Sequence, residues 1–128
     1  MGDEPGSAGT LPRRVEKPWG YEIIWAHTDR YVGKVLHIEA GRRLSYQYHQ
    51  RKEETLRVQS GRMCLTYDEG AGPRQIEMGP GAVFHVRPGT KHRMEALTDV
   101  DVIEVSTPEL DDVVRLADDY GREGTSAP

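Results

Sequence analysis

The chain has 128 residues, and its 17 Lys and Arg are interspersed with 21 Asp and Glu, so no basic stripe indicates a nucleic-acid partner. No apolar run approaches the ~20 residues of a membrane-spanning helix, and the N-terminus lacks the apolar centre of a signal peptide. We therefore expect one cytoplasmic domain that binds neither nucleic acid nor a membrane.

Both ends of the chain contain few large apolar side chains that could be buried in a core. Residues 1–12 and 123–128 are rich in Gly, Pro, Ser and Ala, so we expect flexible tails around a single domain at residues 13–122. Between them, short β-branched or alternating runs are separated by Gly, Pro and Asp turns, which indicates an all-β sandwich or barrel. The predicted strands are 21–26, 31–39, 44–49, 54–60, 62–67, 74–78, 82–87, 91–96 and 100–106.

The segment after Pro108 breaks this pattern. Leu110, Val113, Val114 and Ala117 recur at helical spacing, acidic residues occupy the first turn, and a glycine follows. This spacing predicts a short C-terminal helix packed on the barrel.

The run from residue 41 to residue 61 carries the strongest chemical signal. Successive side chains of a strand point to opposite faces, so Gln47 and His49 share one face and can reach one ion. On the next predicted strand Glu54 alternates with the apolar Leu56 and Val58 and should point inward, while Glu53 should face solvent.

An inward carboxylate in an apolar barrel is costly unless it is paired or binds a cation. His92 follows a Pro-Gly corner and supplies a further donor. Gln47, His49, Glu54 and His92 are therefore the predicted ligands of one divalent metal ion, with zinc first and manganese, nickel, cobalt or iron as alternatives. So few protein ligands leave coordination positions open for water or substrate.

These residues resemble the two motifs of the cupin superfamily. Gly41, Gln47-x-His49, Glu54 and Gly61 have the spacing of the first motif, with Gln in place of its first His. Gly81, Gly89 and His92 match the second, although Arg87 stands where a Pro is expected and Ala96 replaces an Asn. The resemblance implies a double-stranded β-helix, that is, a jelly-roll barrel.

Among cupins, the chain is most similar to type II phosphomannose isomerases, which also occur as the C-terminal domain of bifunctional mannose-1-phosphate guanylyltransferases. The stretches that carry this resemblance are EKPWGYE at 16–22, the run 33–49, GTKHR at 89–93, VIEV at 102–105 and DDYGR at 118–122. The resemblance implies metal-dependent conversion of mannose 6-phosphate to fructose 6-phosphate, a sugar-phosphate isomerase activity. It also marks Arg93 as an active-site residue, whereas strict alternation points Arg93 away from His92.

Further ionisable residues are candidates for the reaction. Lys34 alternates with apolar residues and should point inward, where it would contact the sugar or transfer a proton. Glu104 lies in a similar pattern and is a candidate base, or a partner for Lys34 or Arg93. Arg43 and Lys91 are candidate substrate-binding cations. The general base itself stays unassigned.

Other readings of the sequence remain open. One is a non-catalytic cupin that binds a carbohydrate or regulates, and another is a different metal-dependent cupin enzyme such as an oxygenase. The Gln-x-His departure argues against an iron oxygenase, because such sites generally use more imidazole. Small barrels with exposed edges commonly pair, so we expect a homodimer that shares the run PWGYEIIW at 18–25.

Overall fold

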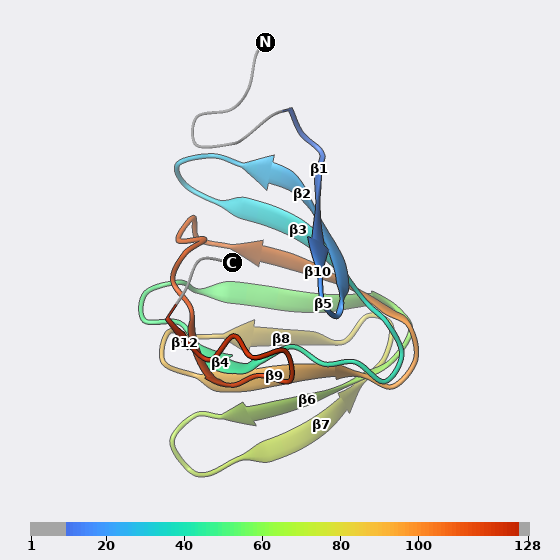
Figure 1. Ribbon diagram of the computed structural model, residues 1–128, viewed down its shortest axis with the longest axis vertical. Coiled ribbons are helices and arrows are strands. Elements are labelled where there is room, and N and C mark those ends of the chain that lie inside the picture. The colour runs from blue at the N-terminus through green and yellow to red at the C-terminus, as the bar shows by residue number, and fades with distance from the viewer. Residues whose placement is uncertain (1–9, 126–128) are drawn as a thin grey trace.

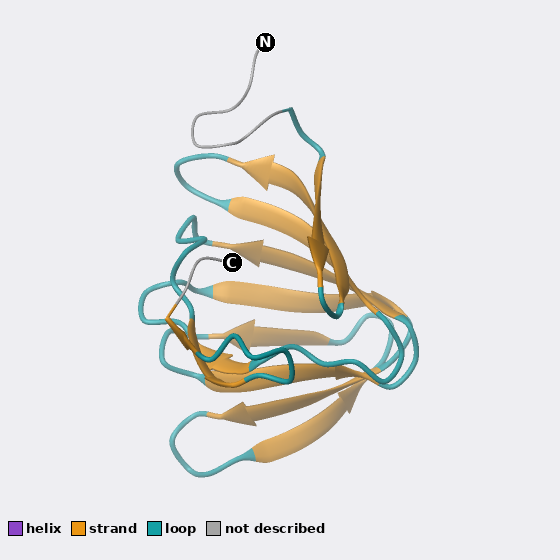
Figure 2. Ribbon diagram, viewed as in Figure 1, coloured by secondary structure: helices purple, strands orange, loops and turns teal. Residues whose placement is uncertain are grey.

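The computed structural model describes residues 10–125, and in this range the chain is built of strands with no helix. Twelve strands follow one another in this range, joined by turns and longer loops (Figure 2). They are β1 (Arg13–Lys17), β2 (Gly20–His27), β3 (Val32–Ile38), β4 (Tyr46–Tyr48), β5 (Glu54–Ser60), β6 (Met63–Asp68), β7 (Arg74–Met78), β8 (Val83–Val86), β9 (Lys91–Ala96), β10 (Val100–Ser106), β11 (Val114–Ala117) and β12 (Gly124–Thr125).

The strands form two six-stranded antiparallel sheets. One has the order β1-β2-β3-β10-β5-β8 and the other β12-β11-β4-β9-β6-β7. The β1–β2 hairpin lies at one end of the molecule and the β6–β7 hairpin at the opposite end (Figure 1). Because consecutive strands repeatedly cross from one sheet to the other, the two sheets close into the jelly-roll barrel expected from the sequence.

Period-two alternation builds the core. Leu56 and Val58 on β5 and Val102 on β10 project inward from the first sheet, and Met63 and Leu65 on β6 project inward from the second. All five side chains are fully buried. Burial of such side chains stabilises a domain by about 1.5–3 kcal/mol each. These apolar side chains fill one part of the barrel interior. Buried polar side chains, described below, line the remainder.

Gly61 shows why one motif position cannot carry a side chain. It links β5 to β6 with a φ of 81°, in the left-handed region that favours glycine. A Cβ atom at this position would lie 2.0 Å from the carbonyl oxygen of Asp99. The sharp turn that carries the chain from one sheet to the other therefore requires glycine.

The predicted C-terminal helix is wrong. Residues 114–117 form β11, which pairs with β4 on one side and with β12 on the other. The alternation of buried Val113 and Arg115 with the more exposed Val114 and Leu116 has the period of a strand. Pairing with β4 satisfies backbone groups that would otherwise lie on an exposed edge, and this long-range gain outweighs the helical spacing.

Two further differences concern the chain ends. Residues 13–17 form β1, which was not among the predicted strands, and Gly124 and Thr125 pair with β11 although they fall in the predicted C-terminal tail. Most of the predicted N-terminal tail lies outside the described residues. No helix long and apolar enough to cross a membrane occurs in the part of the chain that the structure describes.

Candidate metal centre

Backbone pairing sets the predicted ligands on one inner face. Gln47 on β4 lies directly opposite His92 on β9. The same row continues to Arg115 on β11 beyond Gln47, and to Tyr67 on β6 beyond His92. Residues that are paired across neighbouring strands project from the same face of a sheet. The register of the second sheet thus places an amide, an imidazole and a guanidinium side by side inside the barrel.

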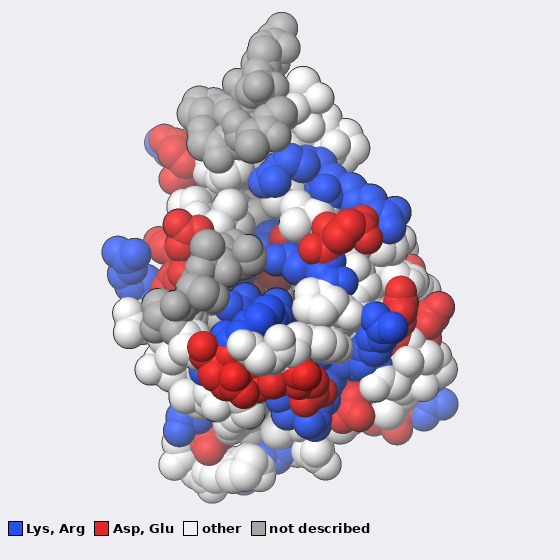
Figure 3. Space-filling view, in the orientation of Figure 1, with Lys and Arg blue, Asp and Glu red and all other residues white. Residues whose placement is uncertain are grey.

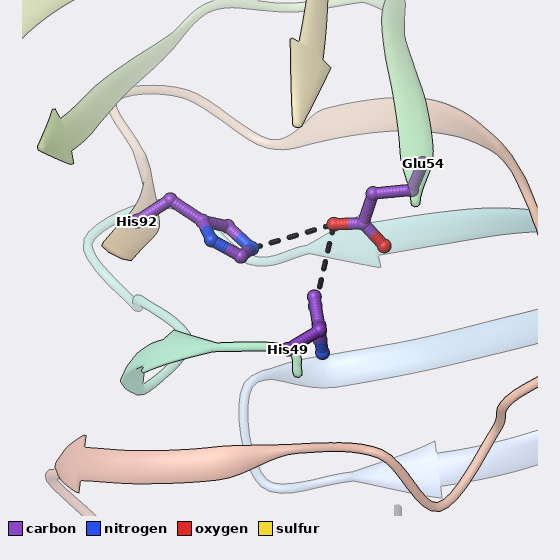
Figure 4. Close-up of side chains that lie close together, drawn as sticks. All are labelled: His49, Glu54 and His92. Carbon is purple, nitrogen blue, oxygen red and sulfur yellow. Dashed lines mark ion pairs between the residues drawn. The ribbon is translucent and has the colours of Figure 1, made fainter. Parts of the chain in front are cut away.

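His49, Glu54 and His92 converge at this row. Glu54 comes from the first sheet, so its carboxylate meets the two imidazoles across the barrel (Figure 4). Its Oε2 atom is 3.3 Å from His92 Nε2 and 3.7 Å from His49 Nε2. One donor atom from each residue lies within 4.8 Å of the other two, and all three side chains are buried. This is a spacing that a single metal ion can bridge.

The hydrogen bonds of the two imidazoles fix which nitrogen is free. His49 Nδ1 donates to the carbonyl oxygen of Asp112 at 2.5 Å, and His92 Nδ1 donates to that of Thr90 at 3.0 Å. A backbone carbonyl only accepts, so each proton sits on Nδ1 and each Nε2 presents a lone pair. Backbone acceptors of this kind commonly orient metal-binding histidines.

The surroundings of the two Nε2 atoms show whether a cation fits the site. Neither His49 Nε2 nor His92 Nε2 has a hydrogen-bond partner among residues 10–125, although both atoms are buried. Both face the carboxylate of Glu54. Two lone pairs that converge on an anion repel it unless a cation or a proton lies between them. The donor set fits a divalent metal such as zinc or manganese.

Lys52, which the sequence did not single out, is buried beside the site. Its ammonium lies 3.1 Å from Glu54 Oε1 and 3.0 Å from Glu104 Oε2. Burial alone would raise the pKa of Glu54, but the charge of the Lys52 ammonium outweighs it and holds that pKa well below the usual range. Burial likewise would lower the pKa of Lys52, and the two carboxylates raise it instead. Both groups therefore stay charged.

Gln47, the fourth predicted ligand, lines the same cavity. Its Oε1 atom accepts a hydrogen bond of 2.5 Å from the hydroxyl of the buried Ser45. This bond holds the amide in place and leaves one lone pair of the oxygen available. Coordination by Gln47 remains a prediction.

A cavity of about 60 Å³ opens next to these groups. Lys34 and Glu104, both predicted to point inward, are buried in its wall. Lys34 Nζ lies 3.3 Å from Oε1 of Glu22, a residue that the sequence analysis did not consider. Glu104 forms its ion pair with Lys52, while Lys34, one of the partners suggested from the sequence, lies opposite it on β3. The cavity thus contains paired charges close to the candidate metal ligands.

The remaining predicted site residues point elsewhere. Arg93 donates to the carbonyl oxygens of Leu44 and Ala117, on the face of β9 opposite to His92, as strict alternation implied. Arg43 forms a partly exposed ion pair with Asp119. These two residues serve the packing of the C-terminal segment and do not line the cavity.

Lys91 and His85 also lie outside the cavity. Lys91 is exposed on β9, on the face that also carries Arg93. His85 lies on β8 and pairs with Glu53, so the interpretation of His85 as a surface residue agrees with its 42% exposed side chain. The predicted substrate-binding role of Lys91 has no support in the geometry.

The family model described as a cupin domain matches residues 34–107. Mannose-1-phosphate guanylyltransferase from Escherichia coli (strain K12) is 37% identical over 116 residues, which cover 86% of this chain and 23% of that protein. A protein of the same activity, ManC from Salmonella typhimurium, is 34% identical over 118 residues, covering 88% of this chain and 24% of that protein. The chain thus spans about a quarter of the length of these relatives.

Solved structures show the same fold at lower identity. KdgF from Halomonas sp. superposes with a TM-score of 0.69 at 22% identity, covering 77% of this chain and 88% of that one. Oxalate decarboxylase from Bacillus subtilis, studied for its Mn(II) centres, gives 0.70 at 18% identity, covering 81% and 30%. The family model matches more than half of the chain, and the two facing antiparallel sheets agree with it: the chain belongs to the cupin family.

Proposed function

We propose that this protein is a metal-dependent aldose–ketose isomerase of a sugar phosphate, with mannose 6-phosphate and fructose 6-phosphate as substrate and product. One observation carries the proposal. His49 and Glu54, two of the candidate metal ligands, line a cavity that also contains an ion-paired lysine, Lys34, and two further carboxylates, Glu22 and Glu104. Candidate metal ligands and groups able to move protons therefore share one cavity.

The residues of this chain divide the reaction between them. Isomerisation removes a proton from the carbon next to the carbonyl and returns it to the former carbonyl carbon. A metal ion held by His49, Glu54 and His92 would supply polarisation of the carbonyl and stabilise the negative charge of the enediolate. Glu22 and Glu104 are the carboxylates of the cavity outside this ligand set, and one of them takes up and returns the proton.

Lys34 positions the substrate beside these carboxylates. Its ammonium is held 3.3 Å from Glu22 and lies on the inner face next to Glu104, its cross-strand partner on β10. From there it can donate a hydrogen bond to a sugar hydroxyl. The buried setting also excludes bulk water, which would otherwise exchange with the proton in transit.

The relatives support a substrate of this class. Two proteins named as mannose-1-phosphate guanylyltransferases are 37% and 34% identical to the chain, and the activity in that name acts on a mannose phosphate. The resemblance to type II phosphomannose isomerases supports the same choice. The Mn(II) centres named for the oxalate decarboxylase support a divalent ion in this fold.

Turnover tests the proposal directly. Purified protein should convert mannose 6-phosphate to fructose 6-phosphate with at least one of zinc, manganese, nickel or cobalt, and a chelator should abolish the reaction. His49→Ala should be inactive, and His85→Ala, which removes a surface imidazole, should match the wild type. Stoichiometric metal binding without turnover under any condition would contradict the isomerase and favour a cupin that only binds a carbohydrate.

A further inference from the structure

Three cations of the cavity come from segments that flank the matched cupin domain. Lys17 is on β1, Arg115 is on β11 and Arg122 follows β11, whereas the family match covers residues 34–107. All three line the same cavity as His49 and Glu54. The flanking segments thus add a cationic group of side chains to a site whose candidate metal ligands come from the shared domain.

Cations outnumber carboxylates among the residues that line this cavity. Five cations line the cavity, namely Lys17, Lys34, Lys52, Arg115 and Arg122, against three carboxylates, Glu22, Glu54 and Glu104. Lys34 and Lys52 are already paired with those carboxylates. Lys and Arg side chains surround a hollow near the middle of the view in Figure 3, with acidic atoms deeper inside. Arg122 is paired with Asp118, which lies outside this lining, so the excess positive charge is carried most directly by Lys17.

Lys17 is the clearest member of this group. It is half-buried, and no carboxylate lies within 4.0 Å of its ammonium in the described part of the chain. Burial lowers its pKa, the more distant Glu22 raises it, and the neighbouring cations Lys34, Arg122 and Arg115 lower it further. A half-buried ammonium among other cations is an arrangement that an anion would relieve.

The two arginines are held in fixed positions. Arg122 donates from Nε and Nη2 to the buried carboxylate of Asp118 at 2.9 and 3.0 Å, which orients its guanidinium. Arg115 is only 7% exposed and is opposite Gln47, next to the candidate metal ligands. Burial and the charge of Arg122 lower the pKa of Arg115, with Asp118 raising it. Both guanidinium groups are thus fixed near the cavity before a ligand binds.

We propose that Lys17, Arg115 and Arg122 form an anion subsite that binds the phosphate group of the substrate. Arginine presents planar pairs of N–H donors that match phosphate oxygens, and lysine adds a point charge. The subsite rests on the proposed function for the identity of the sugar, but the binding of phosphate itself does not depend on it. The shared cupin domain would then supply the metal, and the flanking segments would select a phosphorylated ligand.

Calorimetric titration with inorganic phosphate tests the subsite. The full chain is treated with a chelator so that phosphate cannot bind through a metal ion, and acetate at the same ionic strength serves as the carboxylate control. Phosphate should bind saturably and more tightly than acetate. Lys17→Met should weaken phosphate binding by tenfold or more, because it removes a cation without leaving a buried carboxylate unpaired. Arg74→Met, on an exposed position of β7, should change it less than twofold.

A second variant and a second readout keep the test decisive. Arg122→Lys keeps a charge beside Asp118 but loses the planar donors, so it should weaken phosphate binding while the thermal transition shows that the fold is retained. Phosphate binding that Lys17→Met and Arg122→Lys leave unchanged, or the absence of saturable binding to the wild type, would overturn the subsite.

The two proposals fail separately. If phosphate binding is lost in Lys17→Met but no sugar phosphate is isomerised, the subsite stands and the isomerase falls. If mannose 6-phosphate is isomerised with the same KM by Lys17→Met and by the wild type, the isomerase stands and the subsite falls.

Discussion

The ammonium of Lys52 lies 3.0 Å from Glu104 although the two residues come from the corner before β5 and from β10. The same ammonium is 3.1 Å from Glu54, so one cation neutralises two buried carboxylates. Lys52→Met would leave both carboxylates buried without this partner. Breaking a buried ion pair in this way costs about 3–5 kcal/mol of folding free energy. Urea denaturation in the presence of a chelator measures the loss.

The control for Lys52 is a cation outside the barrel. Lys91→Met, at an exposed position, should change the free energy of unfolding by less than about 0.5 kcal/mol. A Lys52→Met variant as stable as Lys91→Met would show that the two carboxylates are neutralised by another group.

Metal binding should stabilise the fold through the two free imidazole nitrogens. A ligand at 1,000 times its dissociation constant stabilises the state that binds it by about 4.1 kcal/mol. Zinc or manganese should therefore raise the thermal transition of the wild type and of His85→Ala. His92→Ala loses one of the buried donors and should lose most of this shift. An equal shift in His92→Ala and the wild type would place the metal elsewhere.

Asp118 should make stability depend on acid pH. Burial raises the pKa of Asp118, but the guanidinium and backbone N–H of Arg122 outweigh it, so that pKa lies below its usual range. Because the folded state holds the proton less tightly than the unfolded chain, the stabilisation is present above the unfolded pKa of about 3.9. It is lost as the pH falls through the lower, folded pKa.

The variant Asp118→Asn measures this dependence. Its free energy of unfolding should fall furthest below that of the wild type near neutral pH, and the difference should shrink as the pH approaches about 2. Asp29→Asn, at an exposed position, serves as the control and should show no such trend. A difference that grows towards acid pH would contradict the assignment.

The homodimer expected from the sequence remains a prediction, and Trp25 offers a way to test it. This residue, in the run PWGYEIIW, is 47% exposed, and its indole lies over Gly33, where a Cβ atom would be only 2.6 Å from the ring. Val105, on the same sheet, is also 47% exposed. Exposed apolar groups of this kind on a sheet face favour association.

We expect Trp25→Ser to shift the protein from dimer to monomer in light scattering after gel filtration. Leu116→Ser is the matched control, because Leu116 is 44% exposed but lies on the other sheet. A wild type that is monomeric at high concentration, or a Leu116→Ser variant that dissociates as readily, would exclude this interface.

Alternation along single strands accounts for the parts of the site that the sequence predicted. It placed Glu54, Lys34 and Glu104 inward, and all three are buried, because a strand has only two faces and their neighbours are apolar. It also placed Arg93 away from His92, and here the inference from alternation was better than the inference from family resemblance.

The sequence could not predict features that depend on distant segments. Lys52 lies in a corner, where no periodicity tells inside from outside. The spacing of Val113, Val114 and Ala117 fits a helix as well as a strand, and only the edge of β4 decides between them. Arg115 acquires its place beside the cavity through the same pairing. The net charge of the whole chain does not reveal that cations outnumber carboxylates in the lining of this cavity.

Asp112 joins the last part of the chain to the metal centre. Its carbonyl oxygen accepts the proton of His49 Nδ1, and its carboxylate accepts the backbone N–H groups of Gln50, Arg51 and Lys52 at 2.9, 2.6 and 2.8 Å. A chain cut after Thr107 would keep every candidate ligand and yet lose the group that decides which nitrogen of His49 is free. Metal affinity should therefore depend on whether the C-terminal segment is docked, and proteolysis of that segment should release a bound metal before the barrel unfolds.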